Sequence, residues 1–316
     1  MPLFTAVQQG ARPRNRARPA APAKLRLRDC LEAAESPFVA MTAAVARELE
    51  VDERALRVRT LLHLPRIAPY SGLIRAGFVD AELRRVAGQL AGDVSKVADE
   101  APVGNWELRQ LQFAEIRAED AAPIIASRHY LRSARPDARY YALRDPKWHL
   151  PVSICSVSPL QWRRVAGAIR TRFGVPRERT RDVSRVYSHD SAPPNAISYL
   201  LARVRTALRQ DGGVDLLTTA VDRNLGFSGS SYRAASWQHW LTVQPRPYLY
   251  LDRSYASPRQ LREQFGTAAI AELQQRHPGQ LFEQSRVRLR ESLIFCWRVR
   301  GETEFIPETE RLPIHR

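Results

Sequence analysis

The order of strand-like and helix-like segments after residue 106 constrains the fold of this chain more than any other feature. Short runs rich in Val, Ile, Thr and Tyr predict strands, and longer runs with apolar residues every three or four positions predict helices. Strands are expected, in chain order, at 108–116, 139–145, 149–158, 180–189, 214–222 and 241–255. Helices are expected at 120–131, 159–174, 195–210 and 231–240. The pattern predicts an α/β (α+β) chain built on one mixed sheet.

Local signals place the ends of these helices. Glu119 and Asp120 are expected to start the first one, so that Pro123 falls in its first turn, where proline is tolerated. The segment 190–194 combines Asp, Ser and two prolines, which is a strong start signal for the third helix. A Gly-Gly pair at 212–213 ends it.

This order of elements resembles the GCN5-related N-acetyltransferase fold. In that fold a mixed sheet splays apart after its fourth strand, and a helix follows. The tail of the chain is expected to add a helical excursion over 257–281 and a final strand over 292–305.

Three regions are expected along the chain. Residues 1–24 contain prolines and arginines with little to bury, which predicts a disordered basic arm. Residues 25–103 show helical periodicity and predict a helical accessory region, with Asp80 as a helix N-cap. Residues 104–316 are expected to form the acetyltransferase-like catalytic domain.

The charge of the chain favours a polyanionic partner. Its 49 Lys and Arg residues exceed its 33 Asp and Glu residues, for a formal net charge of +16. Arginine suits phosphate recognition because its planar fork donates two parallel hydrogen bonds. We therefore expect nucleic acid as the partner, and a solubilising surface is the alternative.

Other bulk features exclude several classes of protein. Cys30, Cys155 and Cys296 stand alone, without the spacing of a zinc finger or a disulfide scaffold. No apolar run is long enough for a membrane span, and the N-terminus lacks the apolar core of a secretory signal. We expect a cytoplasmic protein in a bacterial cell or an infected host, and the oligomeric state stays open.

Polar residues gather where the later strands end and helices begin, which is where sites are built in α/β sheets. Arg185 and Asp222 lie on strands, and Ser198 and Tyr232 lie in the first turn of helices. Acetyltransferases of this fold usually bind the pyrophosphate of acetyl-CoA with a glycine-rich turn before the central helix. The segment 189–201 has two prolines and no glycine there.

Five short motifs together resemble the Mom-type adenine-modification proteins of phages. They are HY at 129–130, SRVYSH with Arg185, NAIS with Ser198, AVD with Asp222, and YRAASW with Tyr232. Arg185, Ser198, Asp222 and Tyr232 are separated by 13, 24 and 10 positions. The resemblance covers about residues 106–300. It implies a transferase that converts adenine N6 in DNA to a carbamoylmethyl-type adduct, with double-stranded DNA as the partner. The modification would shield bacteriophage DNA from restriction.

The resemblance also implies roles for individual residues, with an acetyl-CoA-type donor and iron as cofactors. His129, Tyr130 and Asp222 would be iron ligands, since imidazole, phenolate and carboxylate suit that metal. The alternative is that His129 and Tyr130 only end a helix and that Asp222 only caps a turn. Catalysis is expected from Ser198, Asp222 and Tyr232. Cofactor binding is expected from Arg185, Asn195 and Ser198.

Two groups of residues are expected to contact DNA. Arg132, Arg135 and Arg139 follow the HY motif in a loop and would clamp phosphate, unless that loop is simply solvated. Arg233 and Trp237 would belong to a stacking and phosphate-binding face. The alternative for the aromatic residues is a place in the core.

Two other functions remain open at this level. One is an acetyltransferase-fold enzyme that acts on a small-molecule or protein amine, although the net charge of +16 does not call for one. The other is a non-enzymatic DNA-binding component of an anti-phage defence system of the DruA type, whose members share a similar HY start and aromatic ending.

Overall fold

The computed structural model describes most of the chain. The described residues are 24–26, 35–67, 72–97, 104–135, 137–148, 150–287, 289–302, 304–306 and 312–314. The expected basic arm, apart from Lys24, and Cys30 lie outside them.

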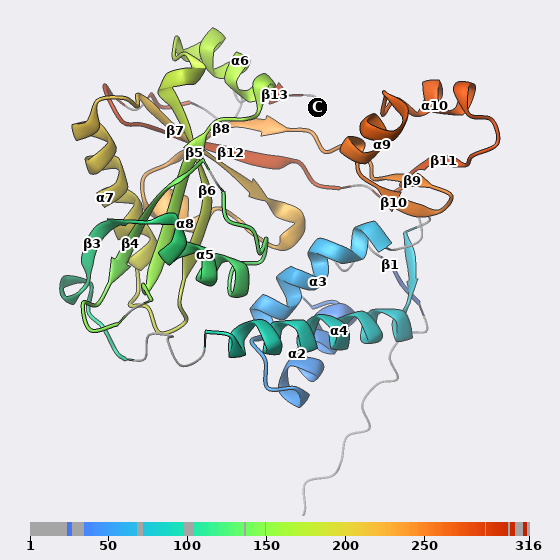
Figure 1. Ribbon diagram of the computed structural model, residues 1–316, viewed down its shortest axis with the longest axis horizontal. Coiled ribbons are helices and arrows are strands. Elements are labelled where there is room, and N and C mark those ends of the chain that lie inside the picture. The colour runs from blue at the N-terminus through green and yellow to red at the C-terminus, as the bar shows by residue number, and fades with distance from the viewer. Residues whose placement is uncertain are drawn as a thin grey trace, which may run out of the picture.

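An eight-stranded mixed sheet forms the centre of the molecule, in the order β13-β8-β12-β7-β6-β5-β4-β3 (Figure 1). Its strands are β3 (Gln112–Ile116), β4 (Arg139–Arg144), β5 (Ser153–Pro159), β6 (Thr180–Ser188), β7 (Leu216–Asp222), β8 (Gln238–Val243), β12 (Ser292–Arg298) and β13 (Leu312–Ile314). The pairs β6–β7 and β8–β13 are parallel, and the other pairs are antiparallel. The late strand β12 inserts between β7 and β8. This is the strand order of the acetyltransferase fold, which confirms the predicted fold class.

Helices cover both faces of this sheet. They are α5 (Ala118–Ser127), α6 (Arg163–Phe173), α7 (Ala196–Asp211) and the short α8 (Ser230–Ala234). Helix α7 packs on one face, where its apolar side meets Tyr141 and Leu217. Helices α5 and α6 pack on the other face, against Tyr140 and Leu216 respectively. Neighbouring residues of one strand thus serve opposite faces, as the pleat of a strand requires.

Several details differ from the sequence-based expectations. The helix expected over 231–240 ends at Ala234, and residues 238–240 belong to strand β8, most of whose side chains are buried in the main sheet. Helix α5 begins at Ala118, so Pro123 lies in its second turn rather than its first. The expected strand 241–255 is divided, because Pro245 and Pro247 end the ladder after β8. The chain then forms a second, three-stranded sheet in the order β10-β9-β11.

We call residues 249–284 the excursion, because they leave the main sheet between β8 and β12 and lie to one side of it (Figure 1). Its elements are β9 (Leu249–Leu251), β10 (Ser254–Ala256), α9 (Pro258–Phe265), α10 (Ile270–Arg276) and β11 (Phe282–Gln284). It has a small apolar core of its own, around Leu261 and Phe282.

The main sheet opens between its two central parallel strands. Strands β6 and β7 pair only through three residues, of which Asp182 opposite Thr218 is the last. A β-bulge lies at the same level, because Ser156 faces Arg185 while Val157 faces Val183, which leaves Ser184 as the extra residue. A bulge bends its strand and increases the local twist. Beyond Asp182, β6 therefore remains paired with β5 and β7 remains paired with β12, so that the two strands separate.

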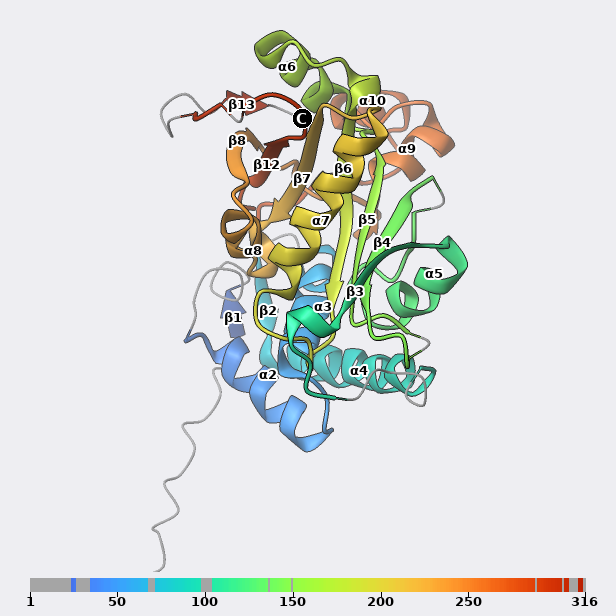
Figure 2. The same cartoon turned by 90° about the vertical axis from the view of Figure 1, so that its left-hand side faces the viewer.

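The N-terminal helices are α2 (Pro37–Glu48), α3 (Glu53–Ile67) and α4 (Ala76–Ser95). A two-stranded ribbon of β1 (Lys24–Arg26) and β2 (Leu73–Arg75) joins them. They lie at the opposite end of the main sheet from α6 (Figure 1, Figure 2). Their apolar core includes Leu225, which follows β7. Helix α4 begins at Ala76, so Asp80 is not its N-cap; Arg75 holds that position.

Two further observations concern the bulk predictions. Cys155 and Cys296 are free thiols in the core. Within the described ranges, no helix combines the length and apolar character needed to cross a membrane.

Candidate functional site

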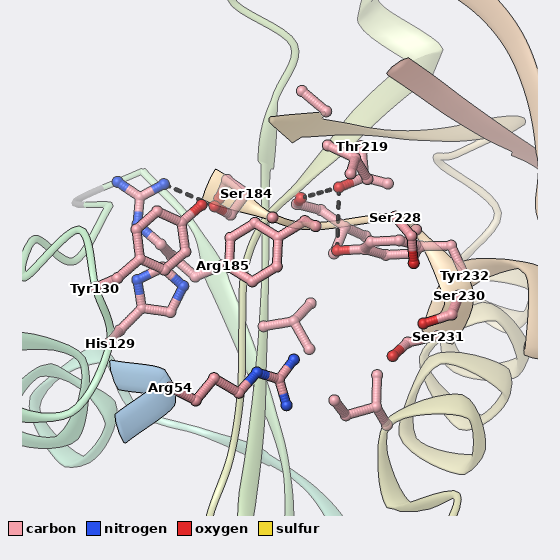
Figure 3. Close-up of a pocket in the computed structure, with 18 residues that line it drawn as sticks. Arg54, His129, Tyr130, Ser184, Arg185, Thr219, Ser228, Ser230, Ser231 and Tyr232 are labelled. Atoms are coloured by element: carbon pink, nitrogen blue, oxygen red, sulfur yellow. Dashed lines mark hydrogen bonds between the residues drawn. The ribbon is translucent and has the colours of Figure 1, made fainter. Parts of the chain in front are cut away.

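Three adjoining cavities surround the opening between β6 and β7. The first, of about 220 Å³, lies on the α7 face and is lined by His129, Tyr130, Arg185 and Tyr232 among others (Figure 3). The second, of about 260 Å³, lies on the α6 face and contains Asp182 and Asp222. The third, of about 300 Å³, surrounds the start of α7.

The first two cavities meet through the opening of the sheet. Both are lined by Tyr130, Arg185 and Thr219, together with the backbone around Ser184. The first cavity shares Ile197 and two serines of α8 with the third. A ligand that enters beside α7 can therefore meet a second ligand that enters from the opposite face of the sheet.

Arg185 is fixed at the junction of the first two cavities. Its Nε donates to the Ser133 carbonyl at 2.9 Å, its Nη2 to Ser133 Oγ at 3.1 Å, and its Nη1 to the Ser184 carbonyl at 2.6 Å. Burial lowers the pKa of Arg185. The side chain presents a positive charge that neutral hydrogen-bond partners orient.

Tyr232 lies at the inner wall of the first cavity, across from Tyr130 (Figure 3). Its Oη is 3.2 Å from Thr219 Oγ1, and Thr219 Oγ1 donates to the Val183 carbonyl of β6 at 2.9 Å. Burial raises the pKa of the Tyr232 phenol well above its usual range. The phenol therefore stays protonated at neutral pH and is suited to donate a hydrogen bond.

His129 and Tyr130 stack on each other at the other side of this cavity, with ring centroids 4.5 Å apart. His129 is 5% exposed, and its Nδ1 accepts a hydrogen bond from the Leu131 amide at 3.1 Å. Burial lowers the pKa of His129 to about 3, so that the ring is neutral. Burial, and then the charge of Asp222, raise the pKa of Tyr130 to about 12.

The iron site expected of these residues and Asp222 stays a prediction, and Tyr130 lines both of the first two cavities. Asp222 lines the second cavity, whereas His129 lines the first. Asp222 Oδ1 already accepts hydrogen bonds from the amide and the side chain of Asn224, both at 2.9 Å. In the part of the chain that the structure describes, no three His, Cys, Asp or Glu side chains are close enough to hold a metal ion. We therefore assign no chemical step to iron.

The third cavity has the character of an anion site. It lies at the start of the 16-residue helix α7, whose first amides have no partner within the helix and carry the positive end of its dipole. Ser198 lines it, and its Oγ donates to the Asn195 carbonyl at 2.9 Å. Asn195 lines it as well, at φ 65°.

The loop arginines that were expected to clamp phosphate all have acidic neighbours. Arg132 Nη2 donates to Asp93 at 2.7 Å, and Arg135 lies 3.9 Å from Asp137. Arg139 binds Glu115 at 2.6 Å and also Asp211. Arg135 additionally lines the second cavity.

The other residues expected at DNA lie around the core behind the first cavity. Trp237 is 2% exposed and packs against Tyr232 and Trp297, with centroids 5.5 and 5.7 Å apart. Arg233 is exposed, and it donates to the Ser228 carbonyl at 2.6 Å while lying over the ring of Phe295. The Arg233 side chain is thus accessible to solvent, whereas the Trp237 ring is buried.

Two residues of the site were not singled out from the sequence. Arg54, from α3, extends into the first cavity (Figure 3). Asp182 lies in the second cavity, where Thr218 Oγ1 donates to it at 3.3 Å. Burial raises the pKa of Asp182 to about 6. Asp182 is the one carboxylate in β6, which was the available signal for it, whereas nothing local marks Arg54.

Strand order and the two-sided opening define a protein of the acetyltransferase fold. The chain belongs to the Mom protein family, whose model matches residues 110–292. No curated protein matches the sequence.

Solved acetyltransferase structures are similar to this chain at low identity. A ribosomal-protein-S5-alanine acetyltransferase from Vibrio fischeri is 11% identical, with a TM-score of 0.35 over 62% of this chain and 97% of that one. A mutant spermidine N-acetyltransferase from Vibrio cholerae is 7% identical, with a TM-score of 0.36 over 60% and 95%. An acetyltransferase from Elizabethkingia anophelis with acetyl-CoA bound is 6% identical, with a TM-score of 0.33 over 60% and 98%.

Proposed function

We propose that this protein is a transferase that modifies adenine N6 in DNA with a carbamoylmethyl-type group and so protects phage DNA from restriction. Membership of the Mom family supports the reaction class. The structural observation that carries the proposal is the pair of cavities that meet at Arg185 and Thr219 from opposite faces of the sheet. One face can receive a group donor, and the other can receive the base.

The donor belongs on the α7 face. Ser198, Asn195 and the start of α7 would hold its phosphates, and Arg54 extends toward the same region from α3. An acetyl-CoA-type donor would bind along this face. The neutral ring of His129 and the protonated phenols of Tyr130 and Tyr232 would line the remainder of its path.

The base belongs on the α6 face, in the second cavity. A new bond at N6 requires that N6 lose a proton, and Asp182 is a suitable acceptor because its pKa of about 6 lies close to neutral pH. Asp222 lines the same cavity and would position the base through its second oxygen. Since adenine is stacked in a duplex, the enzyme must extrude it, at a cost of a few kcal/mol.

Mass spectrometry of DNA nucleosides from bacteria that express the protein tests this proposal. Wild type should produce an adenine species heavier by one acetamide-type group. Asp222→Ala should produce none, and Glu119→Ala, at an exposed position on α5, should behave as wild type. Unmodified adenine in the presence of folded, DNA-binding wild-type protein would contradict the proposal and favour a non-enzymatic DNA-binding component.

A further inference from the structure

A groove of about 880 Å³ adjoins the second cavity on the α6 face. The two share Trp162, Val165, Asp222 and Ser292 in their walls. One wall is the start of α6, and the opposite wall consists of the segment 245–249, Tyr255 and the start of α9. We call this feature the arginine groove.

Seven arginines line this groove, among them Arg66, Arg163, Arg246, Arg259 and Arg262. Asp222 is the one acidic residue among the described residues that line it, and it lies where the groove meets the second cavity. Such a concentration of one charge creates a strong local potential for an anion.

Three of these arginines are available for a ligand. Arg163, Arg246 and Arg262 are exposed, and within the described ranges none of them has a carboxylate partner. The loop arginines 132, 135 and 139 differ in this respect, because each lies beside an acidic residue. A phosphate that approaches the arginine groove would not have to displace a carboxylate from these three side chains.

Aromatic residues lie among the arginines. Trp162 is 37% exposed, and Tyr248 and Tyr255 meet edge to face with centroids 5.8 Å apart. The guanidinium of Arg66 lies 5.5 Å from the centre of the Tyr255 ring. Arginines that track phosphates beside aromatic rings that can stack on bases are the chemistry of nucleic-acid binding.

We propose that the arginine groove binds the sugar–phosphate backbone of duplex DNA and delivers the target base to the second cavity. The groove adds a DNA-binding surface to the proposed function, and the identity of the target base rests on that function. The excursion supplies one wall of the groove, and we assign DNA binding to it. Arg66 of α3, stacked on Tyr255 of β10, fixes the excursion against the N-terminal helices.

Equilibrium binding to a DNA duplex across a salt series tests the groove independently of catalysis. The variant R163A/R246A/R262A removes the three cations that have no carboxylate partner within the described ranges. The control R47A/R109A/R117A removes the same charge from exposed positions that do not line the groove. Thermal unfolding of both variants would establish that they are folded.

The groove variant should bind more weakly, because each of its three missing guanidinium groups would neutralise one phosphate in wild type. Its slope of log affinity against log salt should therefore be smaller by about 3, at about 1 for each phosphate left without a cation. The control should keep the wild-type slope. Equal slopes for the two variants, or a preference of wild type for an RNA duplex of the same sequence, would overturn the proposal.

Nucleoside analysis of the same proteins separates this proposal from the function. Loss of DNA binding by the groove variant, with no adenine modification by wild type, would support the groove and contradict the enzyme. Adenine modification by wild type, with unchanged binding by the groove variant, would support the enzyme and overturn the groove.

Discussion

Asp93 Oδ1 on α4 accepts a hydrogen bond from Arg132 Nη2 at 2.7 Å, which ties the N-terminal helices to the loop after the HY motif. Asp93 Oδ2 accepts a second one from Arg59 Nη1 at 2.8 Å, and the side chains of Arg59 and Asp93 are 4% and 5% exposed. Arg59 also donates to the carbonyl of Ser127, two residues before His129, at 2.5 Å. The N-terminal helices therefore support one wall of the first cavity.

Replacing Asp93 with Ala should lower the free energy of unfolding by about 3–5 kcal/mol, because it leaves the charge of Arg59 buried without a partner. Chemical denaturation measures this loss. Asp80→Ala is the matched control, since it breaks an exposed ion pair with Arg84 and should cost less than about 1 kcal/mol. Similar losses in the two variants would show that Arg59 finds another partner.

Replacing Tyr232 with Phe should lower the rate of adenine modification by about 100-fold or more, because it removes a phenol that can donate a hydrogen bond in the first cavity. DNA affinity should not change. Tyr141→Phe is the control, since the hydroxyl of Tyr141 is buried without a hydrogen-bond partner among the described residues and does not line the cavity. A wild-type rate of modification in Tyr232→Phe would show that this side chain contributes only to packing.

The activity should fall as the pH decreases through about 6, because Asp182 accepts a proton only in its ionised form. His129 does not account for such a transition, since its pKa is about 3. A pH–rate profile of the purified enzyme measures this decrease in activity at low pH. Asp182→Asn should remove both the decrease and most of the activity. An unchanged decrease in Asp182→Asn would assign it to another group.

The same pKa makes a separate prediction about stability. Burial raises the pKa of Asp182 in the folded state above its ordinary value of 3.8, so folding favours the protonated form. The stabilisation that protonation provides is complete below about pH 4 and is lost as the pH rises through about 6. Asp182→Asn should therefore be more stable than wild type at pH 8, with a smaller difference at pH 4. Denaturation at the two pH values measures this.

The sequence predicted the main sheet well because each strand has its own local pattern. Tyr140 and Tyr141 illustrate this, since neighbouring residues of a short apolar run face opposite helical layers. Proline also acts locally, yet Pro245 and Pro247 divided a strand that hydrophobicity alone suggested was continuous.

The candidate site was predictable only in part, because several of its members are distant in sequence. Arg185 lies beside the bulge of β6 and Tyr232 lies in the short helix α8, and both line one cavity. Arg54 reaches that cavity from 75 positions before His129, through the packing of α3 against the loop after β7. The arginine groove joins α3, α6 and the excursion, which no local pattern relates.

Arg54 provides the most direct test of the contribution of the N-terminal helices to the site. Its side chain is exposed and extends into the first cavity, near the serines of α8 that also line the third (Figure 3). Replacing it with Ala should weaken the binding of coenzyme A about tenfold, which corresponds to a loss of about 1.4 kcal/mol. Titration calorimetry measures this, with Arg47→Ala on α2 as the control. Equal affinities would show that the donor phosphates depend on the start of α7 alone, and that α3 contributes only packing.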